Sequence, residues 1–167
     1  VLWLKPASRL SLPAGYGKIG KQGSKVYMVP QTQDMNLIWL GWSTERLKAS
    51  QVFSPVSWKL NGVKGPGSMK VFLNGSFGDV GKVVFDSTTK SGNTLKVNPN
   101  VHAHANWAFS KQGIYRINFT QSVKLANGKT VKDTEVLTIA VGNVDPASAV
   151  DGGKDCIKQT PGVTAAA

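Results

Sequence analysis

A long alternation of apolar and polar residues near the end of the chain constrains the fold most. A period of two is the pattern of a β-strand with one buried face. The Asn127-Gly128 pair that follows predicts a type I′ turn, because both residue types adopt positive φ. The chain then returns over Thr130–Val141, so we expect a long antiparallel hairpin over residues 114–125 and 130–141. The apolar positions are Tyr115, Ile117, Phe119, Val123 and Leu125, with Gln121 as the polar exception, and then Leu137, Ile139 and Val141.

The outer half of the returning strand breaks this pattern. Val131 shares the phase of Leu137, but so do Asp133 and Glu135. Two explanations remain open: the outer half of the hairpin projects into solvent, or a β-bulge shifts the register.

Short apolar runs bounded by turn residues occupy the rest of the chain, which holds 18 Gly and 8 Pro. Hydrophobic residues make up 41% of the sequence and charged residues 17%, as in globular proteins, and no apolar run approaches the roughly 18 residues that cross a bilayer. We therefore expect an all-β protein of antiparallel strands. Residues 44–51 are the one helix candidate and are equally compatible with a loop. The expected strands are Val1–Leu4, Lys25–Val29, Leu37–Trp42, Ser57–Val63, Met69–Leu73, Lys82–Phe85 and Thr94–Val97.

The composition divides the chain into one domain and one tail. Residues 1–142 are expected to form a β-sandwich domain, of which residues 1–24 are rich in loops. Residues 143–167 are rich in Asn, Asp, Pro, Ala, Gly and Thr, which predicts a flexible C-terminal linker. The single cysteine, Cys156, lies in that linker and excludes both an intramolecular disulfide and a zinc site built from cysteines.

The net charge of +11 comes from 20 Lys and Arg against 9 Asp and Glu, and it predicts attraction to an anionic partner. The candidates are nucleic acid, an anionic membrane and a cell-wall polymer. The lysines are scattered singly and Arg occurs only at Arg9, Arg46 and Arg116, so we expect no nucleic-acid partner. A solvated Lys-rich surface is the simplest interpretation.

His102 and His104 are the only histidines, and their spacing places both imidazoles on one face of an extended segment. Such a pair is half of a divalent metal site, and with no thiolate nearby a carboxylate or water has to complete it. We expect Asp34 as the third ligand, with Zn²⁺ as the favoured ion; Glu45, Asp79 and Asp86 are further candidates. The alternative is a pair of imidazoles hydrogen-bonded to the backbone.

Tryptophans surround this segment in the sequence. Trp39 lies in an apolar run and is expected in the core. Trp42 and Trp107 have polar neighbours, so their alternative role is to form the apolar floor of a pocket or to stack on a sugar. Together with Asn106 and Glu45 they are the predicted ligand-binding residues. No Gly-x-Ser-x-Gly motif or pair of converging carboxylates is found, so we expect no enzyme.

Two resemblances follow from these motifs. Gly113-Ile114-Tyr115 with the closing hairpin resembles the last strands of PKD and immunoglobulin-like sandwiches, which implies an immunoglobulin-like β-sandwich with the Tyr115 hydroxyl tying down a corner. Over about residues 25–141 the chain also resembles the actinobacterial surface-anchored repeat domain, or choice-of-anchor M domain. The motifs are DMNLIWLGWSTE at residues 34–45, Gly65-Pro66-Gly67, and HAHANWAF at residues 102–109.

The second resemblance implies an extracellular, cell-wall-associated location and the substrate-binding protein of an ABC transporter as partner. The expected function is therefore a receptor or relay for uptake of a divalent metal cation. Two other functions stay open: an adhesion module that binds carbohydrate or an anionic wall polymer, and a structural spacer without a ligand.

Overall fold

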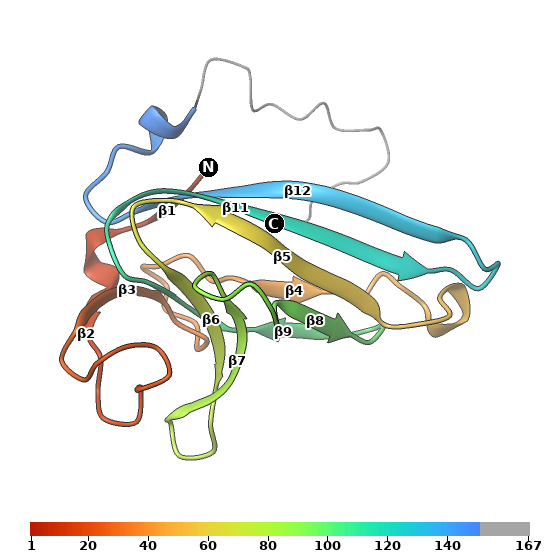
Figure 1. The fold of residues 1–167 in the computed structure, drawn as a ribbon, viewed down its shortest axis with the longest axis horizontal. Helices are drawn as coiled ribbons and strands as arrows, with labels where there is room; N and C mark the ends of the chain where they lie inside the picture. Colours follow the sequence, from red (N-terminus) through yellow and green to blue (C-terminus); the bar gives the residue numbers. More distant parts are fainter. Residues whose placement is uncertain (151–167) are drawn as a thin grey trace.

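The computed structural model describes residues 1–150, and in this range the protein is all-β with almost entirely antiparallel sheets. Two sheets have five strands each, and a third has two (Figure 1). The first sheet has the order β1 (Leu2–Leu4), β12 (Thr130–Val141), β11 (Gly113–Lys124), β5 (Val56–Lys64) and β8 (Thr94–Val97). The second has the order β2 (Arg9–Ser11), β3 (Lys25–Val29), β10 (Asn106–Phe109), β6 (Met69–Asn74) and β7 (Val80–Asp86). The third joins β4 (Gly41–Ser43) to β9 (His102–His104).

The two five-stranded sheets enclose one apolar core, as in a β-sandwich. The main cluster of buried side chains takes members from β5, β11 and β12 of one sheet and from β3, β6 and β10 of the other. Trp58, Trp107 and Phe119 meet in its middle, with Phe119 4.8 Å from Trp58 and 6.1 Å from Trp107 between ring centroids. A smaller cluster on the far side of the second sheet packs under residues 12–19.

The predicted closing hairpin is confirmed. Strands β11 and β12 pair in one unbroken register from Gly113 with Val141 to Lys124 with Thr130. No bulge interrupts this pairing, and the outer half of β12 is exposed, so the first of the two explanations is correct: the outer half projects into solvent.

The turn of this hairpin differs from the prediction. Gly128 has a φ of 84°, but Asn127 is not in the positive-φ region, so a type I′ turn is wrong. Leu125 pairs with Lys129 through a 2.8 Å N–H to carbonyl bond, and Gly128 N donates to the carbonyl of Leu125. The loop therefore has three residues, 126–128, and only the last needs the freedom of glycine.

The predicted strands Lys25–Val29 and Thr94–Val97 are confirmed as β3 and β8, whereas some other elements are shorter than expected or new. Of the predicted strand Leu37–Trp42, only Gly41 and Trp42 belong to the paired strand β4, and Leu37 N bonds back to Asp34 O in a turn before it. The helix candidate of residues 44–51 forms only a 3₁₀ turn, η2 (Ala49–Gln51). The loop-rich beginning contains another 3₁₀ turn, η1 (Pro6–Ser8), and strand β2, while β1 pairs with β12 in parallel.

The predicted tyrosine corner is present. Tyr115 is fully buried, and its hydroxyl donates a 2.8 Å hydrogen bond to the carbonyl of Lys111, four residues upstream. Burial raises the pKa of the Tyr115 phenol, because the charged form loses its hydration. A side chain at Gly65 would collide with the Tyr115 ring, so glycine is needed where the β5–β6 turn crosses it.

The beginning of the predicted linker packs against the domain. Residues 146–149 form a 3₁₀ turn, η3 (Pro146–Ala149), with the Asp145 carboxylate accepting from Ala147 N at 2.9 Å. Ala149 is buried, and its carbonyl accepts from Arg116 Nη2 at 3.3 Å. The rest of the predicted linker, with Cys156, lies outside the described residues. Across residues 1–150, no helix has the length and apolar character that crossing a bilayer requires.

Candidate metal and ligand site

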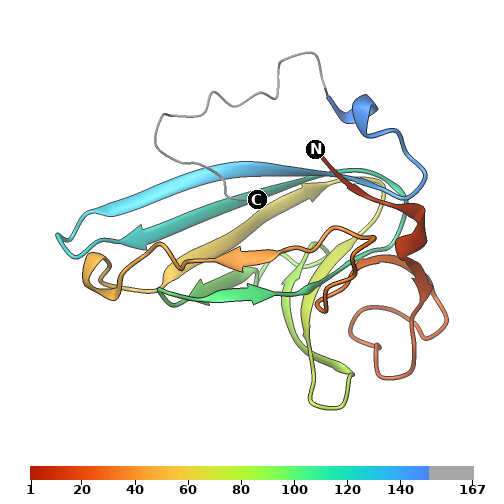
Figure 2. The same ribbon diagram turned by 180° about the vertical axis from the view of Figure 1, so that it is seen from behind.

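The two-stranded β4–β9 sheet presents both histidines on one face. His104 lies opposite Gly41 and His102 opposite Ser43. We call this pair of strands, residues 41–43 and 102–104, the histidine ladder. Figure 2 shows it, with β4 in orange and β9 in green, beside the long strands of the first sheet. The Nε2 atoms of His102 and His104 are 3.1 Å apart. The prediction that this spacing places both imidazoles on one face of an extended segment is confirmed.

Gly41 makes this close pairing possible. A Cβ atom at position 41 would overlap the carbonyl oxygen of Ala103 and lie 2.9 Å from the Cα of His104. Real Cβ atoms do not approach backbone so closely. Any larger residue would therefore push β4 away from the strand that carries the histidines.

Thr44 anchors the end of β4. Its hydroxyl donates to the carbonyl of Asn98 at 2.6 Å and accepts from the N–H of Val101 at 3.0 Å. Its own N–H donates to the carbonyl of Val101 at 2.7 Å. These bonds hold the next residue, Glu45, beside His102.

Glu45 contacts Nδ1 of His102, the ring nitrogen that does not face His104. Its Oε2 lies 2.8 Å from His102 Nδ1 and accepts from the Ser43 hydroxyl at 3.0 Å. The hydrogen bond to His102, followed by that from Ser43, lowers the pKa of Glu45. An ionised Glu45 holds the proton of His102 on Nδ1 and leaves the lone pair of Nε2 facing His104.

Trp39 stacks on His104, which corrects the prediction that Trp39 belongs to the core. The two rings are parallel within 4°, with centroids 3.5 Å apart, and Trp39 is 40% exposed. Its Nε1 donates to the carbonyl of Gln31 at 2.9 Å, which fixes the indole plane. Position 39 precedes Gly41, the partner of His104, by two residues, which is the spacing of a diagonal neighbour across a strand pair. That relation could be found only once residues 41 and 104 were known to pair.

The convergence of two imidazole nitrogens is the arrangement that a metal ion uses. In the absence of an ion, one Nε2 donates its proton to the other. Two nitrogens bound to one tetrahedral Zn²⁺ at about 2.0–2.1 Å lie roughly 3.3 Å apart, so the observed separation needs only a few tenths of an ångström of adjustment. His104 Nδ1 is buried, and within residues 1–150 no group forms a hydrogen bond with it.

The predicted third ligand does not join the pair. Asp34 Oδ1 accepts from Asn36 N at 2.9 Å in a turn that precedes β4, and Asp86 pairs with Lys70 at 3.1 Å. Within residues 1–150, no three or more His, Cys, Asp or Glu side chains are grouped so that they could hold a metal ion. The protein thus offers two imidazoles and one carboxylate that touches the far side of His102.

The remaining predicted ligand-binding residues have structural contacts. Asn106 is buried, its Oδ1 accepts from Gln31 N at 2.8 Å and its Nδ2 donates to Asn74 Oδ1 at 2.7 Å. Trp42 is half-buried and packs edge-on against Trp58, with centroids 5.7 Å apart. Trp107 is 1% exposed in the core, so it offers no face on which a sugar could stack.

Trp107 nevertheless lines a small cavity next to the histidine ladder. The cavity has a volume of about 190 Å³. Because Leu40 and Gly41 form one wall, it adjoins β4. Its lining residues are Leu40, Gly41, Trp58, Trp107, Phe119, Gln121, Glu135 and Leu137.

Comparisons of the chain with protein-family models, with curated proteins and with solved structures give no match. The function proposed below therefore depends on the geometry of the site and on the motifs of the sequence.

Proposed function

We propose that the domain binds a divalent metal cation through the Nε2 atoms of His102 and His104. The observation that carries this proposal is the 3.1 Å separation of these two atoms on one face of β9. Neutral imidazole suits Zn²⁺, Cu²⁺, Fe²⁺ and Ni²⁺, and Zn²⁺ is the favoured ion.

The contact of Glu45 with His102 supports the same proposal. In metal sites, a ligating histidine usually donates its other ring N–H to a carboxylate, which fixes the tautomer and makes the ligand more basic. Glu45 stands in this relation to His102 Nδ1 at 2.8 Å. Trp39 fixes the second imidazole by stacking, so both rings are oriented before an ion arrives.

Two protein ligands make a site that exchanges its ion readily. The side chains of His102 and Glu45 are 52% and 53% exposed, so an ion bound there keeps coordination positions for water or for a group on a partner. Such a site suits a module that passes a cation on. We extend the proposal to an extracellular, cell-wall-associated receptor or relay for an ABC-type uptake system, and this extension is supported by the sequence resemblance. We also propose that the sandwich is of the immunoglobulin-like type, which the Tyr115 corner supports.

Isothermal titration calorimetry with Zn²⁺, Mn²⁺ and Cu²⁺ tests the metal proposal. We expect Zn²⁺ binding in the micromolar range that His102→Ala or His104→Ala abolishes. Asp34→Asn is the control, and because Asp34 is engaged in its own turn we expect its affinity within twofold of wild type. If none of the three ions binds, or if both histidine variants bind as the wild type does, the proposal is wrong.

The adhesion module remains the second candidate, favoured by the exposed indole of Trp39 and the net charge of +11. It predicts retention on purified cell wall that weakens with salt and is insensitive to a chelator. A structural spacer predicts neither retention nor metal binding.

A further inference from the structure

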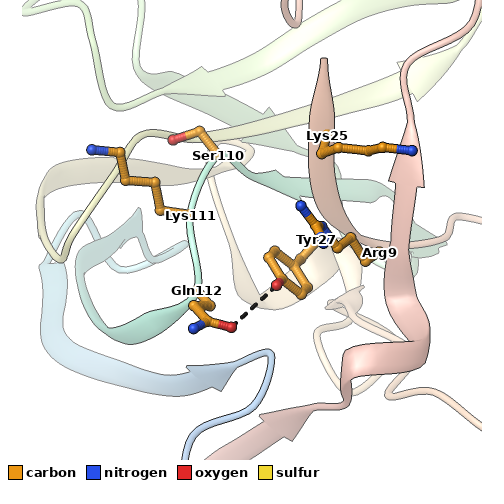
Figure 3. A pocket seen from close by; sticks show the side chains of 6 residues that line it. All are labelled: Arg9, Lys25, Tyr27, Ser110, Lys111 and Gln112. Carbon is orange, nitrogen blue, oxygen red and sulfur yellow. Dashed lines mark hydrogen bonds between the residues drawn. The ribbon is translucent and has the colours of Figure 1, made fainter. Parts of the chain in front are cut away.

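A second pocket, which shares no residue with the histidine ladder, lies at the β2–β3 edge of the second five-stranded sheet. It has a volume of about 430 Å³ and is shown in Figure 3. Its walls come from β2, from β3 and from the turn between β10 and β11. The lining residues are Arg9, Lys25, Tyr27, Ser110, Lys111 and Gln112.

The strand register brings these residues together. Arg9 lies directly opposite Tyr27 in the β2–β3 pair, and Lys25 is two residues before Tyr27, on the same face. Phe109, the last residue of β10, lies opposite Tyr27 on its other side, so the turn at residues 110–112 passes next to the Tyr27 side chain. The arrangement belongs to the paired strands and not to a single loop.

Of the part of the chain that the structure describes, three cationic side chains line the pocket and no carboxylate does. Among residues 1–150, no hydrogen bond or ion pair engages the guanidinium of Arg9 or the ammonium of Lys111. Lys25 is turned toward Ser11, to whose hydroxyl it donates at 2.6 Å, and still contributes its charge. Lys70 is the contrasting case, because Asp86 neutralises it at 3.1 Å.

Neutral polar groups complete the wall. The Tyr27 hydroxyl donates to Gln112 Oε1 at 3.2 Å, the bond drawn in Figure 3. Because Gln112 accepts through its oxygen, its NH₂ group is left to donate elsewhere. The pocket therefore combines uncommitted cationic donors with an amide donor and an aromatic ring.

We propose that this pocket binds an oxyanion of the phosphate class carried on a sugar or polyol. The planar guanidinium of Arg9 matches two oxygens of a phosphoryl group. Lys111 and Lys25 add two positive charges, and a ligand with one carboxylate would leave this charge unbalanced. The volume exceeds that of a phosphate group alone, so the organic part lies against Tyr27 and Gln112. The site is independent of the metal proposal, because it shares no residue with the histidine ladder.

Titrations at constant ionic strength, followed by calorimetry and by amide NMR shifts, test this site. The probes are inorganic phosphate, glycerol 3-phosphate and glycerol. We expect glycerol 3-phosphate to bind more tightly than inorganic phosphate, glycerol not to bind, and the shifts to gather at residues 9, 25–27 and 110–112. A poly(glycerol phosphate) chain distinguishes the sources: binding of the chain as well as the monoester indicates a polymer, and binding of the monoester alone indicates a free metabolite.

Charge-matched variants separate a specific site from general attraction. Arg9→Gln and Lys111→Gln should each weaken glycerol 3-phosphate binding about tenfold. Lys132→Gln removes the same charge from the exposed half of β12 and should change it less than twofold. Far-UV circular dichroism checks that each variant is folded. Equal losses in Arg9→Gln and Lys132→Gln, or no binding to the wild type, would overturn the proposal. So would loss of phosphate binding in the His102→Ala/His104→Ala double variant.

Discussion

The indole of Trp39 lies flat on the imidazole of His104, with ring centroids 3.5 Å apart and planes within 4° of each other. An aromatic stack of this kind contributes about 0.5–1.5 kcal/mol and restricts the rotation of the smaller ring. The consequence is that His104 is held in place from outside the strand that carries it.

Trp39→Ala should therefore weaken Zn²⁺ binding several-fold, because His104 loses the surface that orients it. Trp3→Ala is a matched control: Trp3 is also 40% exposed and also donates its Nε1 to a backbone carbonyl, that of Gly142, at 3.0 Å. Calorimetric titration of both variants measures the difference. Equal affinity in the two variants would show that the stack plays no part in binding.

Glu45→Ala should reduce Zn²⁺ affinity by about 10- to 100-fold, the range found when a carboxylate behind a metal-bound histidine is removed. Asp133 is the control, because it lies on the exposed half of β12 and does not line the cavity that adjoins β4. Asp133→Ala should bind Zn²⁺ as the wild type does. An unchanged affinity in Glu45→Ala would mean that the 2.8 Å contact with His102 does not act on the metal site.

Gly41→Ala should destabilise the protein by about 1–3 kcal/mol and abolish metal binding, because the new Cβ would collide with Ala103 and separate β4 from β9. Gly62, in β5, is the control, since a Cβ there meets nothing within 4 Å. Gly62→Ala should leave stability unchanged or slightly higher. Urea unfolding and Zn²⁺ titration measure both effects; a Gly41→Ala protein with wild-type metal binding would contradict the proposed geometry.

Protonation of the Asp86 carboxylate should lower the free energy of unfolding at acid pH. Its partial burial acts to raise the pKa, but hydrogen bonds from Thr88 and the ion pair with Lys70 outweigh burial and lower it. A carboxyl group with a lower pKa in the folded state contributes stability above its ordinary pKa, and this contribution is lost as pH falls through the folded value.

Asp86→Asn should therefore cost about 1 kcal/mol near neutral pH and flatten the loss of stability below about pH 4. Asp133→Asn, on the exposed half of β12, should shift the free energy of unfolding by less than about 0.5 kcal/mol. Urea unfolding as a function of pH measures both. The expectation fails if the acid-induced loss is equally steep in wild type and Asp86→Asn.

Local patterns predicted the local elements of this fold well. The alternation from Tyr115 to Leu125 depends only on neighbouring residues, and the structure forms the expected hairpin there. The type I′ turn was a local prediction too, and it was wrong because one positive-φ glycine at the end of a three-residue loop closes the hairpin equally well.

The candidate site was predictable only in part, because it joins residues far apart in the chain. The spacing of His102 and His104 reveals their common face, but not which strand lies opposite. The pairing of residues 41–43 with 102–104 is what brings Glu45 and Trp39 to the imidazoles. Asp34 belonged to the same sequence motif, but a turn places its carboxylate on its own backbone.

The projecting half of the hairpin leaves β12 with an open hydrogen-bonding edge. β1 covers only Ile139–Val141, and among residues 1–150 no strand lies beside the outer edge of β12 from Thr130 to Thr138. An open edge of this length is a template on which a second chain could add a strand. The charged side chains of Lys132, Asp133 and Glu135 lie along it, and buried charge is costly, so they oppose edge-to-edge association. Asp133 and Glu135, which break the apolar alternation of this strand, thus also oppose aggregation of the domain.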